Sequence, residues 1–309
     1  MTRILTRGDP ESVLEPAACV AALDEGFRST DPWSGAGERV RTDLPFPGTA
    51  TALIPGVPPG IDAYTVKVNA KFPGARPALR GVICLHSGHD GELLALLDSA
   101  TITAWRTGLA AALGTHVLTN PGPGAGTALG VIGAGAQAEL MVRGLRELRG
   151  IHEVVVHDTD PGRADAFAAR HGGRVLGSPA EVASASEVVL PATWSRTPLP
   201  HLADTRPGQH LTSRGAGEPG KQELSADLLA SSAVVVDDRE LAGSTGGLAA
   251  AARATLGEIL RAGPPGRTDR AERTVYAPVG LPRQDLALAW LAYRQAGRRG
   301  IGTHTDLLS

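Results

Sequence analysis

The chain has 309 residues, of which 42% are hydrophobic and 20% charged, and its formal net charge at pH 7 is −2. These values are typical of a soluble globular protein with one large or two medium domains, and the absence of a strong positive charge argues against nucleic acid as a partner. Two cysteines, Cys19 and Cys84, are too few for a disulfide framework, which favours a reducing, cytoplasmic setting. No apolar run approaches the roughly 20 residues of a membrane span, and no apolar stretch of signal-peptide length begins the chain, so we expect neither membrane insertion nor export.

The first 118 residues have the pattern of an α+β region. Apolar residues at helical spacing predict a helix over 12–30. A long helix is predicted over 99–118, with Ser99 or Thr101 as its N-cap. Between these helices, short apolar stretches bounded by Gly and Pro predict strands of a meandering sheet at 50–55, 63–68, 81–85 and 92–97.

The pattern of predicted elements changes after a Gly/Pro-rich segment at 121–126, where short strands begin to alternate with helices. The expected strands are 128–133, 152–158, 186–193 and 231–238, and the expected helices are 136–148 and 161–172. This alternation predicts a parallel sheet with right-handed crossovers, of the Rossmann type. We place this domain at 119–275. A further long helix after Tyr276 is expected to return to the first region, so that 1–118 and 276–309 form one discontinuous α+β domain.

The Rossmann region opens with the dinucleotide-binding pattern G-x-G-x-x-A. Gly133 permits the tight turn after the strand, Gly135 lets a pyrophosphate approach the backbone, and Ala138 allows close packing of helix and strand. The pattern follows an apolar strand, opens a helix, and is followed by Asp158 at the end of the next strand, which is the context that the motif requires. The residues expected to bind the dinucleotide are Gly133, Gly135, Ala136, Gln137, Asp158, Thr159 and Thr193.

Asp158 also predicts which dinucleotide binds. A carboxylate at this position accepts hydrogen bonds from the ribose hydroxyls and repels a 2′-phosphate, so NAD(H) is favoured over NADP(H). Arg163, close by in the sequence, acts against this preference.

Several segments resemble the ornithine cyclodeaminase/mu-crystallin family. The most specific is LDSATITAWRT at 97–107 followed by GAGAQ at 133–137; KVNAKFP from Lys67, HDTDPGRA from His157, PGKQEL at 219–224 and RQDLALAWLAYRQAGRRGIGT from Arg283 also match. The resemblance covers nearly the whole chain. It implies a homodimer in which the discontinuous domain binds substrate and forms the dimer contact. It also implies hydride transfer between a nicotinamide and the α-carbon of a small amino or imino acid.

The resemblance assigns cations to the carboxylate of such a substrate. Lys67 matches the family's active-site lysine, and Arg106 matches its carboxylate-binding arginine. The planar guanidinium group of an arginine suits bidentate binding of a carboxylate. The alternatives are a structural salt bridge for Lys67 and a surface position for Arg106. A third cation is expected at Arg41, which fits the mu-crystallin spacing, whereas Arg39 fits the cyclodeaminase spacing.

One loop departs from the cyclodeaminase pattern. Cyclodeaminases carry an acid/base Asp in a Gly-Ala-Asp-x-Pro-Gly-Lys segment, but RGAGEPGKQEL has Gly217 at that position and Glu218 next to it. Either Glu218 replaces the Asp as a catalytic group, or the acid/base role is absent. This departure favours an NAD-dependent imine reductase or amino-acid dehydrogenase. The alternatives are an ornithine or lysine cyclodeaminase that recycles its NAD, and a non-catalytic nucleotide-binding protein like a crystallin. We expect no metal site, because His86 and His89 lie in a turn without further ligands.

Overall fold

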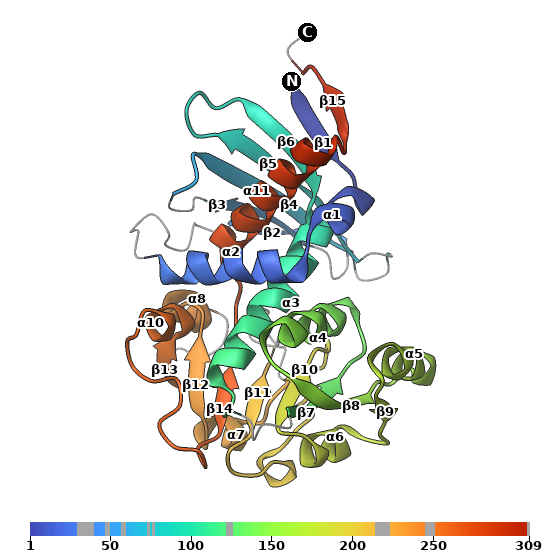
Figure 1. Cartoon of the computed structure of the whole chain (residues 1–309), viewed down its shortest axis with the longest axis vertical. Helices are drawn as coiled ribbons and strands as arrows, with labels where there is room; N and C mark the ends of the chain where they lie inside the picture. Colours follow the sequence, from blue (N-terminus) through green and yellow to red (C-terminus); the bar gives the residue numbers. More distant parts are fainter. Residues whose placement is uncertain are drawn as a thin grey trace. The chain divides into compact units, whose positions relative to one another are not determined.

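The computed structural model describes residues 1–29, 40–46, 50–56, 60–72, 75, 78–121, 126–213, 223–244 and 251–307. The chain divides into two compact units, Met1–Thr107 with Leu281–Ser309, and Gly108–Gly280 (Figure 1). These boundaries differ from the expected ones at 118/119 and 275/276. The first difference arises because Ala111 and Ala112, in the second half of the long helix, belong to the hydrophobic core of the second unit.

Within its described residues, the first unit contains a mixed seven-stranded sheet in the order β15-β1-β6-β5-β4-β3-β2. Only β1 and β6 pair in parallel; the other neighbours are antiparallel. The four strands predicted between the two N-terminal helices are confirmed as β3 to β6. The strands are β1 (Thr2–Leu5), β2 (Val40–Asp43), β3 (Ala50–Gly56), β4 (Ala63–Lys71), β5 (Leu79–Ser87), β6 (Leu93–Asp98) and β15 (Thr303–Thr305).

The helix predicted over 12–30 is confirmed as α2 (Pro16–Arg28), but it begins four residues later than predicted, and residues 12 and 13 belong to a separate helix, α1 (Gly8–Val13). Leu14 and Glu15 are extended between them. Proline disfavours helical geometry in the residue before it and fits the first turn of the helix that it begins, which explains the break. The C-terminal helix α11 (Pro282–Arg299) packs against α2 and against β3 and β4, as Figure 1 also shows.

The long helix predicted over 99–118 is confirmed as α3 (Ser99–Leu118). Its predicted N-cap is wrong. The carboxylate of Asp98 accepts hydrogen bonds from the backbone N–H and the hydroxyl of Thr101, both at 2.8 Å, and so caps the helix. The hydroxyl of Ser99 instead donates to the side-chain oxygen of Asn69 on β4, at 2.5 Å.

Within its described residues, the second unit contains an eight-stranded, all-parallel sheet in the order β13-β12-β14-β11-β10-β7-β8-β9. Its first five strands in the chain therefore follow the order 3-2-1-4-5 of a Rossmann fold, which confirms the predicted fold class. The strands are β7 (Thr127–Ile132), β8 (Ile151–His157), β9 (Arg174–Val175), β10 (Val188–Pro191), β11 (His210–Thr212), β12 (Ala233–Val236), β13 (Ala252–Thr255) and β14 (Thr274–Tyr276).

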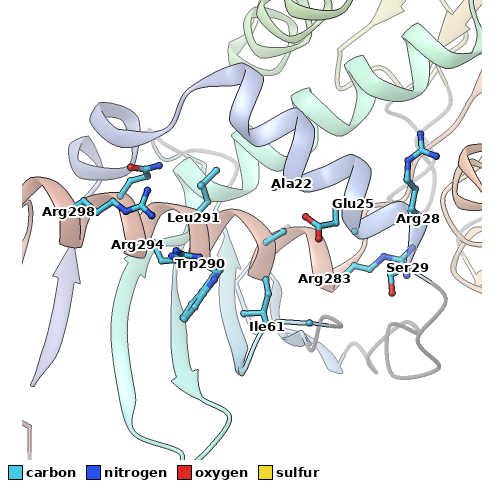
Figure 2. Close-up of a pocket in the computed structure, with 14 residues that line it drawn as sticks. Ala22, Glu25, Arg28, Ser29, Ile61, Arg283, Trp290, Leu291, Arg294 and Arg298 are labelled. Atoms are coloured by element: carbon cyan, nitrogen blue, oxygen red, sulfur yellow. The ribbon is translucent and has the colours of Figure 1, made fainter.

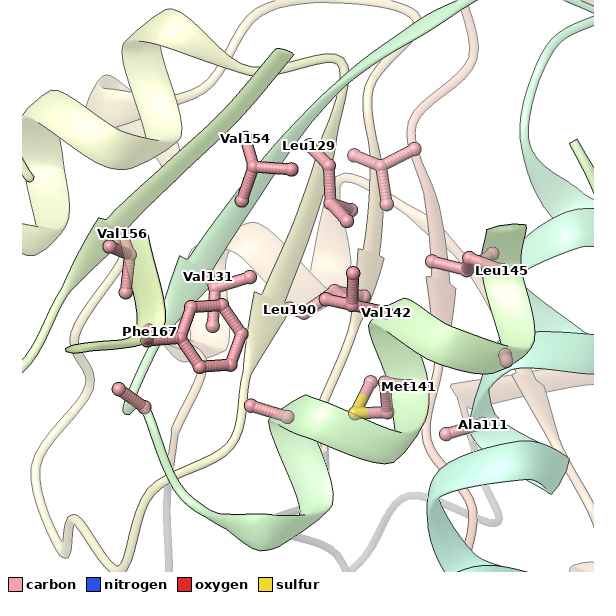
Figure 3. Packing of buried hydrophobic residues seen from close by; sticks show 14 of the residues in the cluster. Ala111, Leu129, Val131, Met141, Val142, Leu145, Val154, Val156, Phe167 and Leu190 are labelled. Carbon is pink, nitrogen blue, oxygen red and sulfur yellow. The ribbon is translucent and has the colours of Figure 1, made fainter. Parts of the chain in front are cut away.

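Helices cover both faces of this sheet. Successive strand residues point to opposite faces, so Val131 and Val154 pack with Met141 and Phe167 on one face (Figure 3), while Val155 packs on the other. Burial on both faces explains why the sequences of these strands are continuous apolar runs. The helices are α4 (Ala136–Leu148), α5 (Pro161–His171), α6 (Pro179–Ala185), α7 (Ala226–Ala230), α8 (Arg239–Ser244) and α10 (Leu256–Leu260). Among the described residues, no helix is both long and apolar enough to span a membrane.

Candidate functional site

The glycine-rich turn of the second unit connects the end of β7 to the start of α4. Gly133 has φ +96°, and a Cβ added there would lie 2.7 Å from the carbonyl oxygen of Ala192. Side chains are excluded at this position both by the backbone conformation and by the close approach of β10. The turn thus needs a glycine for the fold itself.

Gly135 has a different role, because a Cβ added to it would have no atom within 4 Å. It is the N-cap of α4, and no side chain caps this end of the helix. Ala138, in the first turn of α4, is completely buried. Open space beside uncapped backbone N–H groups fits a phosphate, so the residues of this turn suit the pyrophosphate of a dinucleotide.

Asp158 follows β8 and faces this turn. Its carboxylate accepts hydrogen bonds from the backbone N–H groups of Ala134 and Asp160, both at 2.8 Å, and from the guanidinium of Arg163 at 2.9 Å. Partial burial acts to raise the pKa of Asp158, but these two N–H groups and the Arg163 charge outweigh it and lower the pKa. The carboxylate is therefore ionised at neutral pH. Arg163 is paired with the very group that is expected to discriminate between NAD and NADP.

Thr193 lies just beyond β10 and is held by a buried carboxylate that sequence reasoning missed. The backbone N–H and the hydroxyl of Thr193 donate to Glu223 at 2.8 and 2.9 Å, and the hydroxyl of Ser213 donates to its other oxygen at 3.1 Å. Glu223 therefore fixes the chain at the carboxyl end of the parallel sheet, where Rossmann domains bind their ligands. The other expected dinucleotide residues lie around the same edge, with Ala136 and Thr159 exposed and Gln137 half-buried.

In the first unit, polar residues line one face of the inner strand β4. Burial alternates along this strand, so Thr65, Lys67 and Asn69 point to the same buried face. Lys67 lies opposite Ile54 on β3 and Ile83 on β5, in the middle of the sheet. A lysine that is 1% exposed is costly unless its charge is matched.

The matching charge is Asp285, in the first turn of α11. Its carboxylate binds the ammonium of Lys67 through one oxygen and the Nε of Arg106, at 3.1 Å, through the other. Arg106 is 9% exposed, so the alternative of a surface arginine is wrong. Lys67, Arg106 and Asp285 therefore form a buried ion cluster in which one carboxylate binds two cations.

Gln284 completes the surroundings of Arg106. Its side-chain oxygen accepts from the backbone N–H of Leu281 at 3.2 Å, as part of the N-terminal capping box of α11, and from Nη1 of Arg106 at 3.4 Å. The N-terminus of α11 thus supplies both an anion and an amide to the cluster.

Sequence reasoning brought Lys67 and Arg106 into one site but gave no role to Asp285 or Gln284. The available signal was charge balance, since two buried cations require a buried anion, and Asp285 stands in the first turn of a helix that was expected to join this domain. The position of Arg41 is described only for its backbone in β2, opposite Ala52, and its side chain lies outside the description. Arg39, Gly217 and Glu218 also lie outside the described residues.

Of the two histidines expected in one turn, His86 lies near the end of β5 and only His89 lies in the turn that follows. His86 stacks on Tyr64 with ring centroids 4.9 Å apart, and the exposed His89 lies 3.5 Å from Asp62. In the described part of the chain, no three His, Cys, Asp or Glu side chains are placed to hold a metal ion.

A separate cavity of about 720 Å³ lies between α2 and α11 of the first unit (Figure 2). Its lining includes Trp290 and four arginines, Arg28, Arg283, Arg294 and Arg298. None of the three charged residues of the cluster lines it, so the candidate site rests on the cluster and not on this cavity.

The architecture and the sequence are similar to those of known enzymes. A Delta(1)-pyrroline-2-carboxylate reductase of Bacillus cereus is 30% identical over 86% of this chain and 88% of its own. The solved structure of an archaeal alanine dehydrogenase dimer with bound NAD has a TM-score of 0.90 at 26% identity, covering 99% of both chains. That of the Thermococcus litoralis Delta(1)-pyrroline-2-carboxylate reductase, in complex with NADH and L-proline, has a TM-score of 0.88 at 25% identity and covers 98% of this chain and 100% of that one.

The family model described as ornithine cyclodeaminase/mu-crystallin matches residues 2–299, which is nearly the whole chain. It includes the turn at Gly133 and Gly135 as well as all three members of the ion cluster. The chain therefore belongs to the ornithine cyclodeaminase/mu-crystallin family.

Proposed function

We propose that the protein is an NAD-dependent imine reductase or amino-acid dehydrogenase that acts on a small α-imino or α-amino acid. The observation that carries the proposal is the buried cluster of Lys67, Arg106 and Asp285, in which one aspartate holds together the two cations that the family resemblance assigns to a substrate carboxylate. The relatives with this fold include reductases and dehydrogenases that act on such compounds.

NAD(H) is the proposed cofactor. Gly133, Gly135 and the uncapped N-terminus of α4 would hold its pyrophosphate, and the ionised Asp158 would favour a ribose without a 2′-phosphate. Bound NADH supplies the hydride. The two similar solved structures contain NAD and NADH, respectively.

The chain's own residues bind and orient the substrate. Arg106 and Lys67 bind the substrate carboxylate at a buried position. Asp285 binds both cations and holds their side chains in position when no substrate is bound. During reduction the α-carbon accepts a hydride and the imine nitrogen accepts a proton, which gives the amine. Lys67 carries protons at Nζ and is the residue that we propose relays one to the nitrogen.

The experiment is an assay of the purified protein with NADH and small imino acids, one cyclic (1-pyrroline-2-carboxylate) and one acyclic (pyruvate with ammonia). We expect one NADH to be oxidised for each amine formed. A protein that binds NADH but oxidises it with neither compound would contradict the proposal and favour the crystallin-like alternative.

A cyclodeaminase is distinguished in the same assay by ornithine. It would release ammonia and form proline with no net change in NADH. Because Gly217 occupies the position of the acid/base Asp, we expect little ammonia from ornithine. Rapid formation of proline would instead support the cyclodeaminase alternative, and Glu218→Gln would then test whether Glu218 replaces the missing Asp.

We also propose that the protein is a homodimer, since the archaeal alanine dehydrogenase of the same fold is a dimer. Size-exclusion chromatography with light scattering tests this. A mass of one chain at micromolar concentration would contradict it.

A further inference from the structure

The amide of Gln284 has a defined orientation in the first unit. Its oxygen faces two donors, the backbone N–H of Leu281 at 3.2 Å and Nη1 of Arg106 at 3.4 Å. Rotating the amide by half a turn would place its NH₂ group against both donors. The oxygen therefore stays on this side, and the nitrogen points the other way.

The Nε2 atom of Gln284 is buried and has no hydrogen-bond partner among the described residues. The whole residue is only 3% exposed. Buried amide groups are almost always hydrogen-bonded, and an unpaired donor is unfavourable. A second unpaired polar atom, the hydroxyl oxygen of Thr65, lies on the same buried strand face as Lys67. Unpaired polar atoms beside charged groups are a common feature of sites that are completed by a ligand.

We propose that Nε2 of Gln284 donates a hydrogen bond to the carboxylate of the amino or imino acid, next to Arg106. This inference rests on the proposed function and adds a substrate-binding residue to it. The position favours an anionic acceptor, because Gln284 contacts Arg106, the cation that the proposed function assigns to the substrate carboxylate. A neutral amide supplies this donor without adding a charge, whereas a glutamate would offer no donor and would add a negative charge.

Two variants separate the donor from the helix cap. Gln284→Glu keeps an oxygen for Leu281 and Arg106 but replaces the NH₂ donor by a negative charge, and Gln284→Met loses both the donor and the cap without adding a charge. Gln295→Glu is the matched control, because it makes the same change on the same helix away from the cluster.

The measurement is the Kd of L-proline and L-alanine for the NADH-loaded protein, by isothermal titration calorimetry. Neither amino acid reacts with NADH, so binding is read without turnover. We expect both Gln284 variants to raise the Kd by about tenfold or more, equivalent to about 1.4 kcal/mol. We expect the Kd for NADH to change less than twofold, and Gln295→Glu to behave as the wild type. In the imine-reduction assay the same variants should raise KM far more than they lower kcat.

The outcomes separate this inference from the proposed function. An unchanged Kd in Gln284→Glu overturns the inference, even where Gln284→Met binds poorly, since it would show that only the cap matters. A wild-type protein that binds neither amino acid overturns both. A wild-type protein that binds one but does not reduce imino acids overturns the proposed function alone, and the Kd of the variants then still decides the role of Gln284.

Discussion

The two units build their candidate sites by different physical means. In the second unit the site is made mainly by backbone, from a turn whose glycines leave room for a ligand and a helix end that is left uncapped. In the first unit it is made by side chains from three separate segments, β4, α3 and α11. Asp285 reaches across 218 residues of sequence to Lys67 and across 179 to Arg106.

This difference has an energetic consequence. A backbone site buries no additional charge, so a residue that faces open space, such as Gly135, can be altered at little cost to the fold. A cluster of buried ions is stable only while its charges are matched, because a single unpaired charge in the interior is strongly unfavourable. Variants of the first unit should therefore affect substrate and stability together, and variants at Gly135 or Asp158 should affect the cofactor alone.

The largest effect is expected for Lys67→Ala. Removing a buried partner of a carboxylate costs about 4 kcal/mol, which corresponds to about a 10³-fold loss in kcat/KM for imine reduction. The Kd for NADH, measured by nicotinamide fluorescence, should change less than twofold. Lys71→Ala, on the same strand but only partly buried, is the matched control and should keep turnover within about twofold of the wild type. Wild-type turnover in Lys67→Ala would mean that the cluster is purely structural.

Asp285→Asn should have the next largest effect, on stability. It would leave Lys67 and Arg106 together without their shared anion, at a cost of about 3–5 kcal/mol. The free energy of unfolding in urea measures this cost. Adding Lys67→Met to Asp285→Asn removes one of the two unmatched cations, and the double variant should recover a part of the loss. A single variant as stable as the wild type would show that the charges are matched in another way.

Substituting the two glycines of the turn should affect two different properties, the free energy of unfolding for Gly133 and the affinity for NADH for Gly135. Gly133→Ala places a Cβ 2.7 Å from the carbonyl of Ala192 in a left-handed conformation, so it should lower the free energy of unfolding by about 2 kcal/mol or more. Gly135→Ala should leave stability within about 0.5 kcal/mol of the wild type. Its methyl group would occupy the space proposed for the pyrophosphate, so the Kd for NADH should rise about tenfold, by about 1.4 kcal/mol. Equal losses of stability in the two variants would contradict the separation of roles.

How far the sequence predicted each site follows from the same contrast. The turn at Gly133, the strand before it and Asp158 after it are local in the chain, so pattern and spacing were sufficient. For the cluster, the C-terminal helix was expected to return to this domain, but no local pattern shows which of its residues would contact β4. Lys67 and Arg106 were identified by resemblance, but Asp285 was missed because its role exists only in the folded chain. The break before Pro16 was readable from the proline and was overlooked because the apolar spacing continues across it.

Asp158→Ser should change cofactor choice by a smaller amount. With the carboxylate of Asp158 gone, Arg163 keeps its contact with Asp160 at 3.4 Å, but a 2′-phosphate no longer meets the nearer carboxylate, so the ratio of the NADPH and NADH dissociation constants should fall about tenfold, by about 1.4 kcal/mol. In the wild type Asp158 stays ionised between about pH 5 and 8, because its pKa lies below its ordinary value, so any change of this ratio with pH should follow the second ionisation of the 2′-phosphate at about pH 6. Fluorescence titrations with both cofactors at several pH values measure it. A wild-type preference for NADPH would show that Arg163, and not Asp158, decides.

The second unit also contains a buried polar group that marks no site, His210. It is completely buried, and its two ring nitrogens lie 2.8 Å from the hydroxyls of Thr274 and Thr212, so the ring is fully hydrogen-bonded, unlike Gln284. Burial, aided by the charges of Arg267 and Arg149, holds the pKa of His210 well below its usual value, so the native ring is neutral.

The imidazole of His210 in the unfolded chain takes up a proton as the pH falls below about 6.5, and that of the native protein does not. The contribution of His210 to the free energy of unfolding is therefore complete above that pH and is lost below it. The loss should approach about 1.4 kcal/mol per pH unit, and urea unfolding at about pH 7.5 and 5.5 should show a smaller acid-induced loss in His210→Gln than in the wild type. Identical losses would mean that His210 takes up its proton in the folded protein too, and that a satisfied hydrogen-bond network does not keep a buried group neutral here.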